Sequence, residues 1–193
     1  MASKNPKFGL SFDWETSGSD WSSVFAVKHQ GISLGMVVFE MATFLPVDEL
    51  YLEIQFDESK YEWNAEAEAI HGLSREHLAK YGVTPEEAAI QVASMILKWF
   101  GTTQVTVLGH NIDFDIAFMK QLLEPFEVMF KIHLRKIETS SLSLVCFGSS
   151  HSNDLFEMTG LATRSHHNAL EDAKMTLEAV RRIRAVIHET LYG

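Results

Sequence analysis

Hydrophobic and polar positions follow three strand-like patterns in the first third of the chain. Residues 8–15 (FGLSFDWE) alternate between apolar and polar positions, the period of two expected of a strand with one buried face. Residues 32–41 form a near-continuous apolar run, which is typical of a more buried strand. Residues 50–56 alternate again. Because short connections join the three segments, the pattern predicts an antiparallel meander.

The pattern changes after residue 84 to helices and strands in alternation. Thr84, Pro85 and Glu87 form a typical helix start, with a threonine N-cap, proline at the first helical position and glutamate at the third. This helix is expected to run to about Trp99 and to end at Gly101. The further predicted elements are a buried strand at 105–109, a helix carrying the apolar positions of 116–123, an edge strand at 131–137, a short helix around 154–157, and a last helix from 168 to about 190.

The order of these elements predicts the fold class. Three strands followed by alternating helices and strands indicate an α/β fold with a mixed five-stranded sheet and helices on both faces. The sequence has no internal repeat, low-complexity tract or long linker, so we interpret residues 1–193 as a single domain.

Composition narrows the functional classes. Acidic residues outnumber basic ones 26 to 16, for a net charge of −10, which argues against a protein that coats duplex nucleic acid through basic surface alone. The single cysteine, Cys146, excludes an intramolecular disulfide and a cysteine-based zinc site. With neither a secretion signal nor an apolar run long enough to span a bilayer, we expect a soluble cytoplasmic protein that does not associate with membranes.

Two carboxylates lie close together on the first predicted strand. Asp13 and Glu15 are two positions apart and therefore project from the same face, while Trp14 faces the apolar side. Like charges side by side are unfavourable unless a cation lies between them. A solvated face of an edge strand is the alternative interpretation.

A second group of polar residues lies where a buried strand is followed by a helix, at 109–118 (GHNIDFDIAF). Ligands of open α/β sheets bind at such junctions. Asn111 or Asp113 could simply cap the helix. Asp115 lies inside the first helical turn, where its alternative role is a favourable interaction with the helix dipole.

The third group is at 165–173 (SHHNALEDA). On one continuous helix His167 and Asp172 would lie about 140° apart around the axis and could not converge. Asn168 and Glu171 form a capping pattern that predicts a helix start after His167, which frees the histidine to approach the same point as Asp172. An ordinary capped helix with a surface histidine pair is the alternative. Together, the three groups predict a carboxylate site for Mg²⁺ or Mn²⁺, since these ions prefer oxygen ligands.

These segments also resemble a known family. FDWETSG, GHNIDFDIAF and HHNALEDA are similar to the three motifs of the DEDDh (DnaQ-like) 3′→5′ exonucleases, such as the proofreading subunit of bacterial DNA polymerase III, RNase T and oligoribonuclease. The resemblance covers about residues 8–188, and residues 63–78 resemble the family segment that follows the third strand. It implies an RNase H-like fold.

The resemblance also implies roles for individual residues. His167 matches the family's general base, whereas His166 is one place too early and is expected to be an accessory neighbour. Two divalent ions, Mg²⁺ or Mn²⁺, would be held by the four motif carboxylates, which are Asp13, Glu15, Asp115 and Asp172.

Other positions are matched less specifically. By family position Thr16, Ser17, His110 and Asn111 are expected to contact the terminal nucleotide, although a plain turn and a structural histidine are the alternatives. Relatives often carry aspartate where this chain has Glu138, so the role of Glu138 stays open.

The activity implied is hydrolysis of single-stranded nucleic acid from the 3′ end to nucleoside 5′-monophosphates, with DNA favoured and RNA also allowed. A homodimer or a polymerase partner is compatible with this activity. The alternatives are a non-catalytic binding module and a phosphodiesterase for small nucleotides. Two interpretations stay open for five basic residues. They could bind the backbone of a single-stranded nucleic acid, or they could be solvated charges that protect an edge strand from pairing with another chain. The five are Lys131, His133, Arg135, Lys136 and Arg164.

Overall fold

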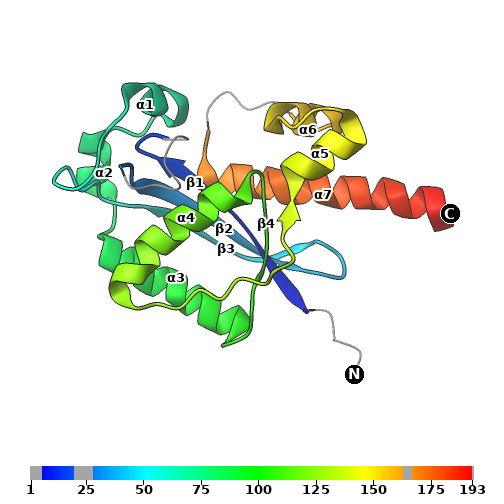
Figure 1. The fold of residues 1–193 in the computed structure, drawn as a ribbon, viewed down its shortest axis with the longest axis horizontal. Helices are drawn as coiled ribbons and strands as arrows, with labels where there is room; N and C mark the ends of the chain where they lie inside the picture. Colours follow the sequence, from blue (N-terminus) through cyan, green and yellow to red (C-terminus); the bar gives the residue numbers. More distant parts are fainter. Residues whose placement is uncertain (1–5, 20–27, 163–166, 193) are drawn as a thin grey trace.

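A mixed five-stranded sheet forms the centre of the molecule (Figure 1). The computed structural model describes residues 6–19, 28–162 and 167–192. Strands β1 (Phe8–Thr16), β2 (Gly31–Glu40) and β3 (Pro46–Glu53) pair in antiparallel order. The predicted meander is therefore confirmed.

Two further strands extend the sheet on the other side of β1, in the order β3-β2-β1-β4-β5. Strand β4 (Thr106–Gly109) runs parallel to β1, and β5 (Ile137–Glu138) runs parallel to β4. The carboxyl ends of β1 and β4 consequently lie at the same edge of the sheet. This is the RNase H-like arrangement expected from the sequence.

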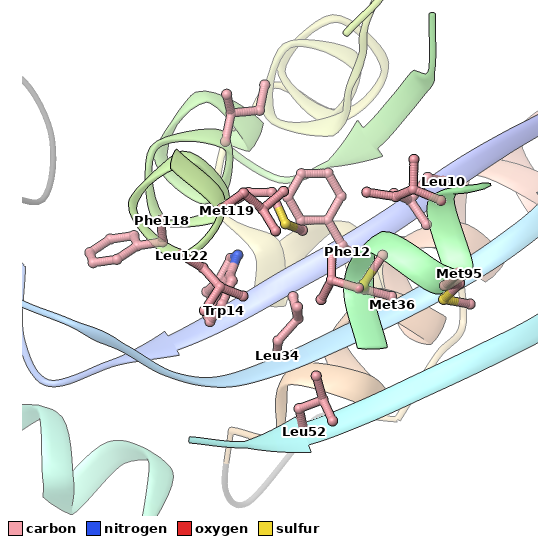
Figure 2. Packing of buried hydrophobic residues seen from close by; sticks show 14 of the residues in the cluster. Leu10, Phe12, Trp14, Leu34, Met36, Leu52, Met95, Phe118, Met119 and Leu122 are labelled. Carbon is pink, nitrogen blue, oxygen red and sulfur yellow. The ribbon is translucent and has the colours of Figure 1, made fainter. Parts of the chain in front are cut away.

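Helices cover both faces of the sheet. On one face, α3 (Pro85–Phe100) and α4 (Ile112–Leu123) enclose the larger core. In Figure 2, the side chains of Phe12 and Trp14 on β1 point towards α4, where Met119 and Leu122 belong to the same core. On the other face, α7 (Ala169–Tyr192) packs through Ala173, Leu177 and Val180. Beyond Ile183 the side chains of α7 are exposed, and the helix extends past the sheet in Figure 1.

The predicted bounds were wrong at two strands. The third strand begins at Pro46 rather than at residue 50, because proline is tolerated on an edge strand that pairs on one side only. The edge strand predicted at 131–137 is reduced to β5 and an isolated bridge between Ile132 and Val105. Leu134, which the alternation placed on a buried face, is 94% exposed.

Several short helices had no assignment in the sequence analysis. These are α1 (Ala65–His71), α2 (Arg75–Tyr81) and α5 (Thr139–Phe147), together with a 3₁₀ turn at Glu124–Phe126. The predicted short helix near residue 154 is present as α6 (Ser152–Met158). Across the described ranges, the helices lack the combination of length and apolar character that crossing a membrane requires.

Candidate active site

A cavity of about 160 Å³ opens at the sheet edge where β1 and β4 end. The start of α7 and part of α6 form its other walls. It brings together all five residues of the three acidic motifs, although these lie far apart in the sequence. Its lining residues are Asp13, Trp14, Glu15, His110, Asn111, Phe114, Asp115, Ser152, Phe156, His167, Asp172 and Thr176.

Strand β1 supplies Asp13 and Glu15. In the ladder with β2, Asp13 lies opposite Gly35 and Glu15 opposite Ser33, so both carboxylates project from one face. Glu15 is 7% exposed, which is unusual for a carboxylate. Trp14 points to the other face and packs in the core with α4, as the alternation predicted.

Helix α4 supplies Asp115 from its first turn. The carboxylate is 2% exposed, and the backbone N–H of Trp14 donates a hydrogen bond to its Oδ1 at 3.0 Å. Burial raises the pKa of Asp115 well above its usual value, and the nearby carboxylates of Glu15 and Glu138 raise it further. The site therefore concentrates negative charge in a place where water does little to stabilise it, an arrangement that a bound cation would relieve.

Glu138 organises the start of α4. Asn111, in the left-handed region at φ 57°, precedes the helix and makes no side-chain cap. Instead, Oε1 of Glu138 accepts hydrogen bonds from the N–H groups of Asn111 and Ser140, and Oε2 accepts one from Ile112, all at 2.9 Å. A single carboxylate thus caps both α4 and α5. Sequence reasoning left Glu138 open because these contacts join segments 26 and 27 residues apart.

Helix α7 begins where the capping pattern predicted. Oδ1 of Asn168 accepts hydrogen bonds from the N–H groups of Leu170 and Glu171, both at 3.1 Å. His167 consequently precedes the helix, while Asp172 lies within its first turns and is 2% exposed. Nδ1 of His167 lies 3.6 Å from Oδ2 of Asp172. Both side chains address the same cavity, as expected.

Two contacts fix the start of α7 against the sheet. A Cβ on Gly35 of β2 would lie 2.2 Å from the backbone N of Leu170 and 2.3 Å from the carbonyl O of Ala169. Only glycine therefore permits this approach. On β1, the hydroxyl of Ser11 donates a hydrogen bond to the carbonyl of Ala173 at 2.9 Å. These contacts place Asp172 beside the carboxylates of β1.

Helix α1 supports His167 from the other side. The N–H of His167 donates to the carbonyl of Ile70 at 3.3 Å. His71, which follows Ile70, is only 8% exposed. Burial lowers the pKa of the His71 imidazole, and the nearby His167 lowers it further. Nδ1 of His71 accepts a hydrogen bond from the N–H of Leu73 at 3.0 Å. The local sequence pattern gives this segment no part in the site, since its contact with His167 joins residues far apart in the chain.

Three of the motif residues form a compact group of potential ligands. One atom each from Glu15, His167 and Asp172 lie within 4.8 Å of one another. Asp13 and Asp115 line the same cavity. Carboxylate oxygens with a single imidazole suit a hard divalent cation such as Mg²⁺ or Mn²⁺, so the donor set fits the predicted metal.

The four residues predicted to contact a nucleotide fall into two pairs. His110 and Asn111 line the cavity. In contrast, the Thr16 hydroxyl donates to the carbonyl of Gly18 at 2.8 Å, and the buried hydroxyl of Ser17 donates to the carbonyl of Glu62 at 2.8 Å. Those two hydroxyls stabilise the turn after β1. A role for any of the four in substrate binding stays a prediction.

The cavity also has walls that the motifs did not indicate. Ser152 and Phe156 reach it from α6, and Thr176 reaches it from α7. His110 joins the start of α5 to the segment before α6, because its two ring nitrogens lie 3.0 Å from the Thr139 hydroxyl and 2.9 Å from the Ser150 carbonyl. Of the other residues named from the sequence, Arg164 and His166 lie outside the described residues.

The chain is similar to known proteins in sequence and in fold. A model of the family described as exonuclease matches residues 10–180. No curated protein sequence matches the chain significantly.

Solved structures with the same fold are distant in sequence. The chain is 14% identical to E. coli exonuclease I in complex with a 5cy-dT13 oligonucleotide, with a TM-score of 0.73 over 94% of this chain and 41% of that chain. Exonuclease I from Methylocaldum szegediense is 18% identical, with a TM-score of 0.70 over 92% of this chain and 40% of that chain. The nuclease domain of 3′hExo, a DEDDh family member bound to rAMP, is 14% identical, with a TM-score of 0.71 over 96% and 95% of the two chains. The chain thus spans about two fifths of the exonuclease I chains that it matches.

Proposed function

This chain belongs to the exonuclease family, and we propose that it is a metal-dependent 3′→5′ exonuclease acting on single-stranded nucleic acid, with DNA favoured over RNA. Its products would be nucleoside 5′-monophosphates. The observation that supports this proposal is the convergence of Asp13, Glu15, Asp115, Asp172 and His167 on one cavity. Exonuclease I, a structural neighbour, is described in complex with an oligodeoxynucleotide.

The four carboxylates would hold two divalent cations. The burial of Glu15, Asp115 and Asp172, each below 10% exposure, supports this role, because buried carboxylates are costly without a compensating positive charge. When bound, such cations would lower the pKa of a coordinated water and neutralise charge on the scissile phosphate. The carboxylates themselves would orient these groups and would not attack the substrate.

His167 is the proposed general base. Its side chain is 39% exposed, so it can exchange a proton with solvent, and its Nδ1 lies 3.6 Å from Asp172. A neutral imidazole in this position can accept a proton from the attacking water.

One assay tests the proposal. End-labelled single- and double-stranded DNA and RNA are incubated with Mg²⁺, Mn²⁺ or a chelator, and products are resolved by length. We expect stepwise shortening from the 3′ end of single strands, lost with the chelator and in Asp172→Asn. His167→Ala should reduce the rate about 10²–10⁴-fold while substrate is still bound. His77→Ala is the matched control, since this histidine pairs with Glu53 at 2.6 Å outside the cavity lining.

Two results would contradict the proposal. Tight oligonucleotide binding without any metal-dependent release of mononucleotides would indicate a binding module instead. An unchanged rate in His167→Ala would remove the assigned base.

A further inference from the structure

A basic segment follows the outer edge of the sheet. Residues 128–136 (VMFKIHLRK) contain three lysine or arginine residues, one histidine and no acidic residue, in a chain with a net charge of −10. We call the four side chains Lys131, His133, Arg135 and Lys136 the basic strip. It is a local departure from the charge of the molecule.

The basic strip runs along β4. At its start, the N–H of Val105 donates to the carbonyl of Lys131, and the N–H of His133 donates to the carbonyl of Val105, both at 2.8 Å. At its end, the segment pairs with Leu108 through Ile137. The strip therefore passes from the amino end of β4 to its carboxyl end, where the cavity lies.

The end of the strip is joined to the cavity wall. Nζ of Lys136 forms an ion pair with Asp113 in the first turn of α4. Two residues further along, Glu138 accepts the hydrogen bonds from Asn111 and Ile112 described above. Since Asn111 lines the cavity, the strip leads directly to the site of the proposed reaction.

The strip presents its cations to solvent. Lys131 and Arg135 are exposed. Leu134, between them in the sequence, is 94% exposed, so the strip also presents one apolar side chain to solvent. Six extended residues span at most about 20 Å, comparable with several nucleotides of a single strand. Single-stranded nucleic acids bind grooves that combine cations along the backbone with side chains, most often aromatic, that contact the bases.

We propose that the basic strip binds the phosphates of the single strand upstream of its 3′ end, so that the exonuclease holds substrates of several nucleotides more tightly than dinucleotides. This inference rests on the proposed function and adds a path for the strand outside the cavity. Lys131 and Arg135 would contact phosphates, and Leu134 would contact a base. Neither cation touches the reacting atoms, so each contributes to binding alone.

The test compares substrate lengths in a charge-reversed variant. KM and kcat are measured for a dinucleotide and a 12-nucleotide single strand with the parent protein and with Lys131→Glu/Arg135→Glu. We expect KM for the 12-mer to rise on the order of tenfold with kcat unchanged, because two phosphate contacts are lost. The kinetics of the dinucleotide should not change. The slope of log KM against log salt for the 12-mer should fall by about 1.4, at about 0.7 for each phosphate.

A control variant changes the net charge equally at side chains outside the cavity lining and the strip. Lys7→Glu/Lys80→Glu alters two exposed lysines that lie over Phe8 and Tyr81, and should leave both substrates unaffected. If charge reversal disturbs folding, the milder Lys131→Gln/Arg135→Gln variant serves instead; it loses the same two phosphate contacts, so its salt slope should fall by a similar amount, about 1.4.

The outcomes separate the two proposals. If the parent hydrolyses both substrates but the variants keep the parental KM and salt slope for the 12-mer, the strip does not bind substrate. If activity falls equally with the dinucleotide and the 12-mer, or if the variants aggregate and their kinetics do not change, these cations protect the sheet edge and do not bind substrate. Failure of the parent to hydrolyse either substrate would instead refute the proposed function.

Discussion

Replacement of Glu138 by alanine should destabilise the protein and reduce its activity together. The carboxylate accepts hydrogen bonds from the N–H groups of Asn111, Ile112 and Ser140, each at 2.9 Å. In Glu138→Ala these donors lose their protein partner, and α4 begins without a side-chain cap.

The expected magnitude follows from the number and type of these bonds. A buried hydrogen bond to a charged group contributes about 1.5–3 kcal/mol, and loss of a helix cap costs about 1–2 kcal/mol. Because Glu138 is only half-buried, water replaces part of the lost bonding. Removal of a negative charge near Asp115 also offsets part of the loss. We expect the free energy of unfolding to fall by about 2–3 kcal/mol, which lowers the melting temperature by about 5–10 °C in a chain of this size.

Thermal unfolding followed by circular dichroism measures this effect. Glu138→Gln keeps one acceptor oxygen and should lose about half as much stability. Glu157→Ala, on the exposed surface of α6, is the control and should stay within about 0.5 kcal/mol of the parent. Displacement of Asp115 should also lower kcat by about tenfold to a hundredfold. A melting temperature of Glu138→Ala within 1 °C of the parent, in repeated scans, would refute the reasoning.

Three further predictions concern the same region. Gly35→Ala should lower stability by about 1–3 kcal/mol and reduce activity, because its Cβ would lie 2.2 Å from the N of Leu170 and 2.3 Å from the O of Ala169; unchanged unfolding and kinetics would contradict this. Mg²⁺ or Mn²⁺ at about a hundred times its dissociation constant should raise stability by about 2.7 kcal/mol in a calorimetric scan, and Asp172→Asn should lose most of that gain. Burial raises the pKa of Tyr51 from 10.0 to about 12, so the stability it contributes is complete below pH 10 and is lost as the pH rises towards 12. Alkaline absorbance titration of Tyr51→Phe should therefore lack the last phenol to ionise.

Local signals predicted most of the geometry of the candidate site. The period of two at 8–15 placed Asp13 and Glu15 on one face, because side-chain direction in a strand depends only on position. The Asn168 cap placed His167 outside α7, since a cap is formed by residues adjacent in sequence. Each of these inferences needed only a few neighbouring residues.

Features that depend on distant contacts could not be predicted in this way. The role of Glu138 arises from bonds to N–H groups 26 and 27 residues away. Helix α5 (TSSLSLVCF) has no clear apolar period, and its start depends on the same carboxylate. At 131–137 the alternation suggested a full strand, but Leu134 is exposed and the segment pairs with β4 only near its two ends.

The distribution of the acidic side chains along the chain has a consequence for synthesis in the cell. Asp13 lies on the first strand, whereas Asp172 lies on the last helix, which packs on the sheet through Ala173 and Leu177. A nascent polypeptide therefore cannot assemble the cavity before α7 has left the ribosome, even when the whole sheet has already formed.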